Sequence, residues 1–219
     1  MKKLLPFFVF TAFILMVGQA HAAKKTIGII VFDGVLTSDV IGPAEVFGAA
    51  TRLSWFTDYD VQMINVNTQK TIITEEGIKI NVDTNITEEQ KLTVLLLPSA
   101  YDMKSLLNNE VLINFIQTQA KHVVWLGSNC SGALLLAESG LLNGKQATTW
   151  AGGELEFQKA YPKVRVKKDS NYVVDGNVIT SNGGIVSYMA ALKMLALMSS
   201  EKLAQEVSDA LQISRLVKR

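Results

Sequence analysis

The chain has 219 residues, a single cysteine and a formal net charge of +1, and 48% of its residues are hydrophobic. A charge balance this close to zero gives no electrostatic reason to expect nucleic acid or an anionic membrane surface as a partner. One cysteine, Cys130, excludes a disulfide within the chain. Composition therefore favours neither nucleic-acid nor membrane binding, and it leaves a lone thiol to be explained.

The first two dozen residues have the three-part pattern of a secretory signal peptide. Lys2 and Lys3 are basic, residues 4–17 are apolar and uncharged, and Ala20-His21-Ala22 has small residues at both positions of an A-x-A cleavage site. The apolar run is short for the ~20 residues of a membrane-spanning helix. We expect residues 1–22 to be removed. That leaves a periplasmic protein with a net charge of −1 and no stable membrane insertion.

The mature part, residues 23–219, has roughly 200 residues, which suffices for one domain with a sizeable core. In its first half, apolar runs of strand length alternate with amphipathic stretches. The expected elements are a buried strand over 26–32, a helix from about 38 with Pro43 in its first turn, a strand over 59–66, a hairpin over 70–82, a buried strand over 92–97, and a helix over 103–120.

The second half continues the alternation, with a buried strand core over 123–126 and a helix over 133–138 that we expect Gly144 to cap. Short strands are expected over 164–166, 172–174 and 178–180, and a last long helix should end at Met198. Alternating strands and helices predict a single α/β domain with a mostly parallel sheet covered on both faces.

The segment around Cys130 is the most informative part of the chain. A buried strand passes through Gly127 and Ser128 into Cys130, and Ser131-Gly132 begins a helix. Such a turn holds a side chain at the carboxyl edge of the sheet, where open α/β folds bind ligands. The helix N-terminus favours a thiolate over a thiol. A lone cysteine in an exported chain indicates a reactive thiol or an intermolecular bridge, although free cysteines also pack as small hydrophobic residues.

A reactive thiol usually works with a base, and His122 is the one histidine of the mature chain. It precedes Cys130 by roughly 26 Å of extended strand, so we place it at the opposite end of the sheet. Asp39 is the alternative, because it follows the first strand, whose carboxyl end can face that of the Cys130 strand. Asp39 could also simply cap a helix. The residues alone leave both interpretations open.

Several spaced motifs resemble proteins of the ThiJ/PfpI superfamily, which share the class I glutamine amidotransferase-like fold. They are Phe32-Asp33-Gly34-Val35, Gly42-Pro43, Glu45-Val46-Phe47, residues 128–133, residues 140–144, residues 147–150 and residues 175–181. Together they are most similar to the branch of isonitrile hydratases and AraC-type sensor domains.

The resemblance implies a flavodoxin-like three-layer sandwich with a cysteine elbow, commonly a homodimer, with no metal or organic cofactor. Cys130 matches the nucleophile position. Asp39 matches the carboxylate that approaches the cysteine in isonitrile hydratases. Ser131 stands where those enzymes have a threonine.

Two departures from the branch pattern affect the expected chemistry. Trp150 follows the paired threonines where the branch usually has histidine, which weakens the case for protease, amidotransferase or deglycase activity. Pro98-Ser99-Ala100 replaces a usual Pro-Gly-Gly, so an oxyanion contact from that loop is expected to be reshaped or lost. The chain also ends too soon after the last matched helix for a helix-turn-helix module, so we expect no role in transcription.

We expect a cysteine-dependent enzyme of the isonitrile hydratase type that acts on a small electrophile. Cys130 would attack or polarise the carbon, Asp39 would relay protons and Ser131 would orient the substrate. Two other hypotheses remain open: a periplasmic redox or ligand sensor that oxidises Cys130, and a degenerate binding or chaperone-like protein of the same fold.

Overall fold

The computed structural model describes residues 23–55 and 57–217. Their backbone forms a seven-stranded sheet in the order β10-β11-β7-β6-β1-β2-β5, in which only the β10–β11 pair is antiparallel. The mostly parallel α/β sheet predicted from the sequence is therefore confirmed. The predicted signal peptide, residues 1–22, lies outside the described residues. The strands of this sheet are β1 (Ala23–Val31), β2 (Thr57–Asn65), β5 (Thr84–Asn85), β6 (Val94–Leu97), β7 (Trp125–Asn129), β10 (Tyr172–Asp175) and β11 (Val178–Ser181).

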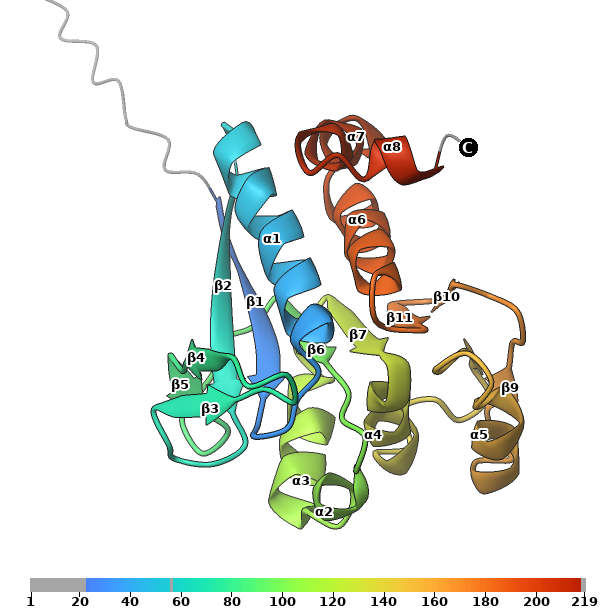
Figure 1. Ribbon diagram of the computed structural model, residues 1–219. Coiled ribbons are helices and arrows are strands. Elements are labelled where there is room, and N and C mark those ends of the chain that lie inside the picture. Colours follow the sequence, from blue (N-terminus) through green and yellow to red (C-terminus); the bar gives the residue numbers. More distant parts are fainter. Residues whose placement is uncertain (1–22, 56, 218–219) are drawn as a thin grey trace, which may run out of the picture.

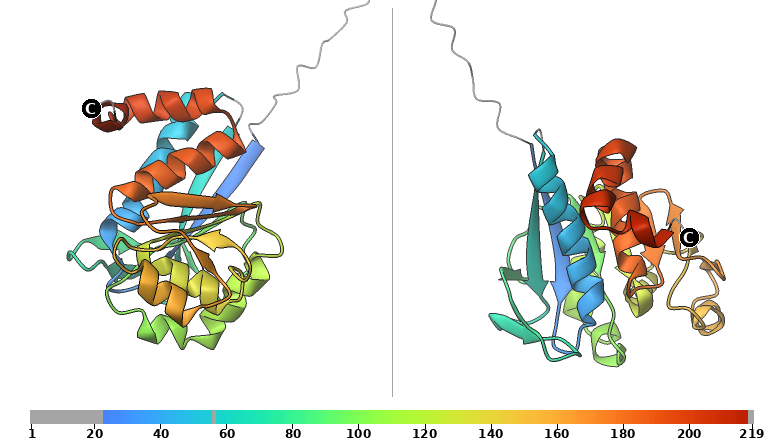
Figure 2. Two further views of the ribbon diagram at one scale, coloured as in Figure 1. Left: turned by 90° about the vertical axis from the view of Figure 1, so that its right-hand side faces the viewer. Right: turned by 45° about the horizontal axis from the view of Figure 1, so that its top comes forward.

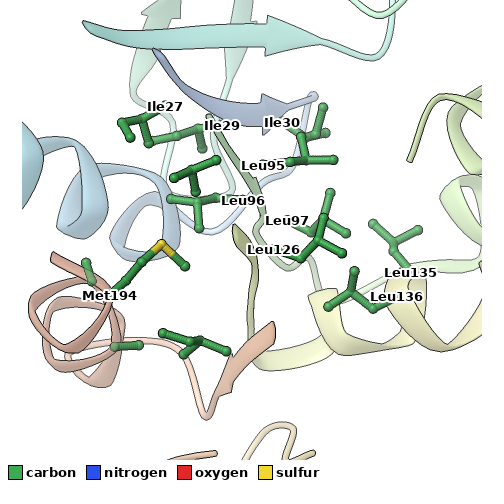
Figure 3. Close-up of a cluster of buried hydrophobic side chains, with 14 of the residues drawn as sticks. Ile27, Ile29, Ile30, Leu95, Leu96, Leu97, Leu126, Leu135, Leu136 and Met194 are labelled. Atoms are coloured by element: carbon green, nitrogen blue, oxygen red, sulfur yellow. The ribbon is translucent and has the colours of Figure 1, made fainter. Parts of the chain in front are cut away.

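Helices cover both faces of the sheet (Figures 1 and 2). One face carries α1 (Thr37–Leu53), α6 (Val186–Met198) and α7 (Glu201–Ala210). The other carries α2 (Lys104–Leu107), α3 (Glu110–Gln119) and α4 (Ala133–Glu138). Figure 3 shows the consequence in the core, where strand side chains meet Met194 of α6 on one side and Leu135 and Leu136 of α4 on the other.

The apolar runs form strands because their side chains are buried on both faces of the sheet. Ile27, Ile29 and Ile30 of β1 are fully buried, and so are Val94 and Leu95 of β6. Burying a side chain of this size contributes about 1.5–3 kcal/mol relative to exposing it. Since β1 and β6 are neighbours in register, their carboxyl ends lie side by side at one edge of the sheet.

Smaller elements flank this sheet. The hairpin predicted over 70–82 is present as β3 (Thr71–Ile73) and β4 (Lys79–Asn81), which turn at Gly77 with φ of +84°. A second two-stranded sheet pairs β8 (Gln146–Ala147) with β9 (Arg165–Val166), and α5 (Glu154–Ala160) lies between them in sequence. The sequence analysis predicted neither β8 nor α5.

The structure corrects three predictions about the helices. The helix predicted over 103–120 is broken in two, because Asn109 accepts a hydrogen bond from Leu112 N and so begins a new helix, α3. Helix α4 ends at Glu138, as predicted, but the glycine with positive φ that follows its end is Gly140, with φ of +75°, and not Gly144 as expected. The chain also continues past Met198 into α7 and α8 (Ser214–Val217), whereas we expected α6 to be the last helix.

Candidate active site

Cys130 has a backbone conformation that side chains rarely adopt. It follows β7 directly, begins a single 3₁₀ turn (η1, Cys130–Gly132) and has φ of +51°. A non-glycine residue in the left-handed region costs roughly 1–3 kcal/mol and persists only where the surrounding structure enforces it. The thiol is half-buried. The predicted elbow is thus present, and its strain marks Cys130 as a functional candidate.

Glycines let two other segments approach the elbow closely. A methyl group on Gly132 would collide with the carbonyl oxygen of Leu97 at the end of β6. A methyl group on Gly183, whose φ is +79°, would lie 2.5 Å from Cys130 Cβ and 3.0 Å from Asp39 Oδ1. Gly183 therefore lies against both Cys130 and Asp39, and the three residues come from three distant parts of the chain.

Asp39 does not cap its helix. Helix α1 begins at Thr37 with Leu36 as its N-cap, and the Asp39 side chain in the first turn is fully buried. Its Oδ1 accepts hydrogen bonds from Gly184 N and Ser187 Oγ, both at 2.8 Å, and its Oδ2 accepts one from Ser99 Oγ at 2.5 Å. The carboxylate is thus buried and held by hydrogen bonds from the loops that follow β6 and β11 and from the first turn of α6.

The pKa of the Asp39 carboxyl is raised by this burial, which outweighs the hydrogen bonds from Ser99, Ser187 and Gly184. The pKa of the Cys130 thiol is raised as well. Burial is the largest cause and the negative charge of Asp39 adds to it, while hydrogen bonds from Ser99 and Ser131 act in the opposite direction. The expected preference for thiolate is therefore wrong, because burial and the charge of Asp39 both raise the pKa of the thiol.

Ser99 lies between the thiol and the carboxylate, because its hydroxyl donates its one proton to Asp39 Oδ2 and also interacts with the thiol of Cys130. The sequence analysis treated Pro98-Ser99-Ala100 only as a departure from a family pattern and missed this role. The loop offers no obvious oxyanion donor: Ser99 N hydrogen-bonds to Asp39, and Ala100 N donates to Met103 Sδ at 3.3 Å. The expected reshaping of this loop agrees with these contacts.

Ser131 is buried beside Cys130, and its Oγ donates a 2.9 Å hydrogen bond to the carbonyl oxygen of Ala100. The Ser131 side chain and backbone also hydrogen-bond to the thiol. The hydrogen bond to Ala100 ties the elbow to the loop after β6. The structure therefore brings Cys130, Asp39 and Ser131 to one place, as expected, and adds Ser99 to them.

A second group of polar side chains fixes the backbone of the elbow. Thr149 Oγ1 donates to the carbonyl oxygen of Cys130 at 2.9 Å, and Asn182 Nδ2 donates to the carbonyl oxygen of Thr149. Asn129 Nδ2 donates to the main-chain oxygen of Asp39 at 3.1 Å, and Ser181 Oγ donates to Asn129 Oδ1. The run of polar residues and glycines after β11 was the sequence signal that could have located this group.

His122, which the sequence analysis considered, and Glu45, two turns after Asp39 on α1, both lie away from the thiol. His122 is exposed in the turn before β7, at the amino end of the strand that ends at Cys130, as predicted. Glu45 accepts a 2.6 Å hydrogen bond from Tyr188 Oη on α6 and does not contact the thiol. The titratable partner that the structure gives Cys130 is Asp39.

The described residues contain neither a cluster of metal-binding side chains nor a membrane-spanning helix. No group of three or more His, Cys, Asp or Glu side chains there could hold a metal ion. No helix in the same part of the chain is long and apolar enough to cross a membrane.

The fold and this site define an α/β protein with a strained cysteine beside a buried carboxylic acid at the carboxyl edge of its sheet. Residues 25–197 match the DJ-1/PfpI family, and the chain belongs to this family. An isonitrile hydratase from Pseudomonas putida is 31% identical over 156 residues, which cover 69% of this chain and 65% of the relative. The transcriptional regulator CdhR from Pseudomonas aeruginosa is 27% identical over 145 residues, which cover 66% of this chain and 43% of that protein.

Solved structures confirm the fold. A ThiJ/PfpI family protein from Pseudomonas syringae superposes with a TM-score of 0.77 at 20% identity, covering 87% of this chain and 76% of the other. DJ-1beta from Drosophila melanogaster superposes with a TM-score of 0.76 at 21% identity, covering 86% and 98%. The chain spans less than two thirds of the length of both curated relatives named above.

Proposed function

We propose that the protein is a cofactor-independent enzyme of the isonitrile hydratase type, with Cys130 as nucleophile and Asp39 as proton relay. The observation that carries this proposal is the Ser99 hydroxyl, which donates to the Asp39 carboxyl group and also interacts with the Cys130 thiol, so that it links the two groups. The similarity to the Pseudomonas putida isonitrile hydratase supports it.

The chemistry of an isonitrile suits a site that retains protons. The terminal carbon of R–NC carries a lone pair, and it becomes electrophilic once it accepts a proton. Burial raises the pKa of both Asp39 and Cys130, so the pair keeps a proton to donate. The proton moves to the carbon while the sulfur bonds to the same carbon, which gives a thioimidate. Water then adds to this carbon, the C–S bond breaks, the thiol regains its proton, and the product is an N-substituted formamide.

The surroundings of the site favour a substrate with an apolar substituent. Three loops contact Cys130, Ser131 or Asp39. In each loop, a large apolar residue directly follows the residue that makes the contact. Tyr101 follows Ala100 and is 82% exposed, Ile185 follows Gly184 and is 64% exposed, and Trp150 follows Thr149 and is half-buried. Because Tyr101 and Ile185 adjoin these contacts and are exposed, we infer that they bind an apolar substituent of the substrate.

The experiment is to incubate the mature protein with alkyl and aryl isonitriles and to follow formamide by NMR. We expect turnover that Cys130→Ser and Asp39→Asn abolish. Glu45→Gln removes a carboxylate from the same helix without touching the site, so it should retain activity. Absence of turnover on every isonitrile, and on simple α-oxoaldehydes, would overturn the proposal.

A ligand sensor is the second candidate, favoured by the match of two thirds of this chain to the regulator CdhR. A sensor would bind an apolar electrophile without releasing product. Binding of an isonitrile to both wild type and Cys130→Ser, with no formamide from either, would support it. A redox sensor is distinguished by intact mass after mild peroxide, which would show added oxygen on Cys130. An unmodified thiol after this treatment would exclude the redox sensor.

The proposal also places the mature protein in the periplasm as a homodimer. The signal-like sequence of residues 1–22 supports export. The mass of the protein recovered from the periplasmic fraction tests cleavage after Ala22, and light scattering tests the dimer.

A further inference from the structure

A groove lies where helix α7 packs against α6 and leads into α8 (Figure 1). Its volume is about 410 Å³, and small-molecule pockets have volumes of roughly 300–1,000 Å³. The match to the DJ-1/PfpI family ends at residue 197, whereas α7 begins at Glu201. The groove is therefore built partly by a segment outside the family match, and none of the elbow residues lines it.

Helices α6 and α7 each present one face to this groove. The lining residues of each helix recur at spacings of three and four positions, which places them on one side of that helix. They are Met189, Leu192, Lys193 and Ala196 of α6 and Glu201, Ala204, Gln205 and Ser208 of α7, and Tyr172 of β10 with Ile213 and Ser214 completes the lining. The groove thus runs along the two helices.

The α6 side of the groove is apolar and only partly covered. Lys193 is the one charged residue of α6, and a helix so uniformly apolar is normally buried all round. Met189, Leu192 and Ala196 are nevertheless only half-buried. Apolar surface left open in a concave setting marks a binding site, because an apolar ligand removes that surface from water.

Two charged side chains line the groove, and they differ in exposure. Lys193 Nζ lies 3.1 Å from Glu201 Oε1, with the lysine side chain 33% exposed and the glutamate side chain 79% exposed. An exposed ion pair adds little stability, so a ligand carboxylate can replace Glu201 on Lys193 at small cost. Glu201 also lies in the first turn of α7, where the helix dipole favours its negative charge without the lysine.

We infer that this groove binds a small amphipathic carboxylate. The apolar chain lies along Met189, Leu192 and Ala196, and the carboxylate binds Lys193 Nζ in place of Glu201. The limited volume favours a small molecule over a protein partner, whose interface would bury about 800 Å² on each side. The inference does not rest on the proposed enzymatic function, because the groove shares no residue with the elbow.

The first test is calorimetric titration of the mature protein with decanoate, and with decylammonium as a ligand of equal chain length and opposite charge. We expect saturable binding of decanoate and several-fold weaker binding of decylammonium. Absence of saturable decanoate binding overturns the inference. Equal binding of the two ligands overturns the assignment of a carboxylate to Lys193.

The second test locates the bound molecule with two variants. Lys193→Met keeps an apolar stem and removes the charge, so decanoate should bind roughly fivefold more weakly, the effect of losing a partly exposed ion pair. Ala196→Phe fills the groove from α6 and should abolish binding. The matched control is Lys202→Met, since Lys202 also lies on α7, is 86% exposed and does not line the groove. This control should bind decanoate as the wild type does.

The Tm of each variant shows whether it is folded. Lys193 is partly exposed, so Lys193→Met should fold and decides the outcome even if Ala196→Phe does not. An unchanged decanoate affinity in Lys193→Met overturns the role of the lysine. An unchanged affinity in a folded Ala196→Phe variant places the ligand outside the groove and overturns the inference.

Discussion

Replacing Asp39 by asparagine tests how the carboxylate and the thiol interact. The amide introduced by Asp39→Asn keeps an oxygen that can accept the bonds from Ser187 and Gly184, but the substitution removes the negative charge that raises the pKa of Cys130. The thiol pKa in the variant should therefore fall, and alkylation near neutral pH should become faster. Turnover, if present, should be lost at the same time, because the relay is missing.

The size of the effect follows from the separation of the two groups. Both lie against Gly183, so thiol and carboxylate are close neighbours. Two unit charges about 5 Å apart in an effective dielectric of about 20 interact by about 3 kcal/mol. Because the thiol is half-buried and solvent screens part of this energy, we expect the pKa of Cys130 to fall by only part of that interaction, which should still make alkylation near neutral pH at least several-fold faster.

The assay is the rate of iodoacetamide alkylation of the mature protein against pH, followed by intact mass. Asp102→Asn is the matched control, since it removes an exposed carboxylate from the loop after β6 and should leave the midpoint unchanged. A midpoint in Asp39→Asn that is unchanged or higher than in the wild type would show that Asp39 is neutral when the thiol titrates. It would refute the charge coupling described above.

Three other substitutions give distinct outcomes. Ser99→Ala removes a hydroxyl that lowers the pKa of both Asp39 and Cys130, so the alkylation midpoint should rise, opposite to Asp39→Asn; an unchanged midpoint would contradict the bridging role. Gly183→Ala, at φ of +79° and in collision with Cys130 Cβ, should lower stability by more than about 1 kcal/mol in urea unfolding, whereas Gly77→Ala, at φ of +84° with open space around it, should show only the backbone cost. Glu76 accepts hydrogen bonds from Thr37 N and Oγ1 at the start of α1, which lowers its pKa, so Glu76→Gln should cost roughly 0.3–1 kcal/mol at neutral pH. Because the folded pKa is depressed, this difference between wild type and variant should be complete above the ordinary carboxyl pKa and disappear as the pH falls through the folded value; a difference that persists in acid would rule out the charge as its cause.

The sequence predicted the central strands because they obey one simple rule. Ile27, Ile29 and Ile30 are buried on both faces, so the run is apolar without alternation. The rule does not show where a polar side chain interrupts a helical pattern. Asn109 does so by capping the start of α3 inside an otherwise continuous helical pattern. The rule also did not predict α7. Ser200 caps the start of this helix by accepting a hydrogen bond from Leu203 N, and we did not use this local signal.

The site could be predicted only in part. Cys130 and Asp39 were identifiable because each follows a recognisable strand, and parallel strands place their carboxyl ends together. The hydrogen-bond partners of Asp39 could not be predicted. Gly184 and Ser187 lie 145 and 148 residues further along the chain, and their contacts with Asp39 depend on how α6 packs against α1. The direction of the Cys130 pKa shift was wrong for a related reason: burial and charge are properties of the assembled fold.

The sequence separation of these contacts has a consequence for the growing polypeptide. When Cys130 leaves the ribosome, Ser99 and Asp39 have already been synthesised, but Gly183, Gly184 and Ser187 have not. Until α6 is made and packs against α1, Asp39 lacks two of its hydrogen-bond partners and nothing covers the elbow from that side. An incomplete chain therefore carries an ordinary, unshielded thiol. We therefore expect Cys130 to be alkylated faster in a chain that stops before α6 than in the folded protein, so that this one sulfur atom reports whether α6 has packed against α1.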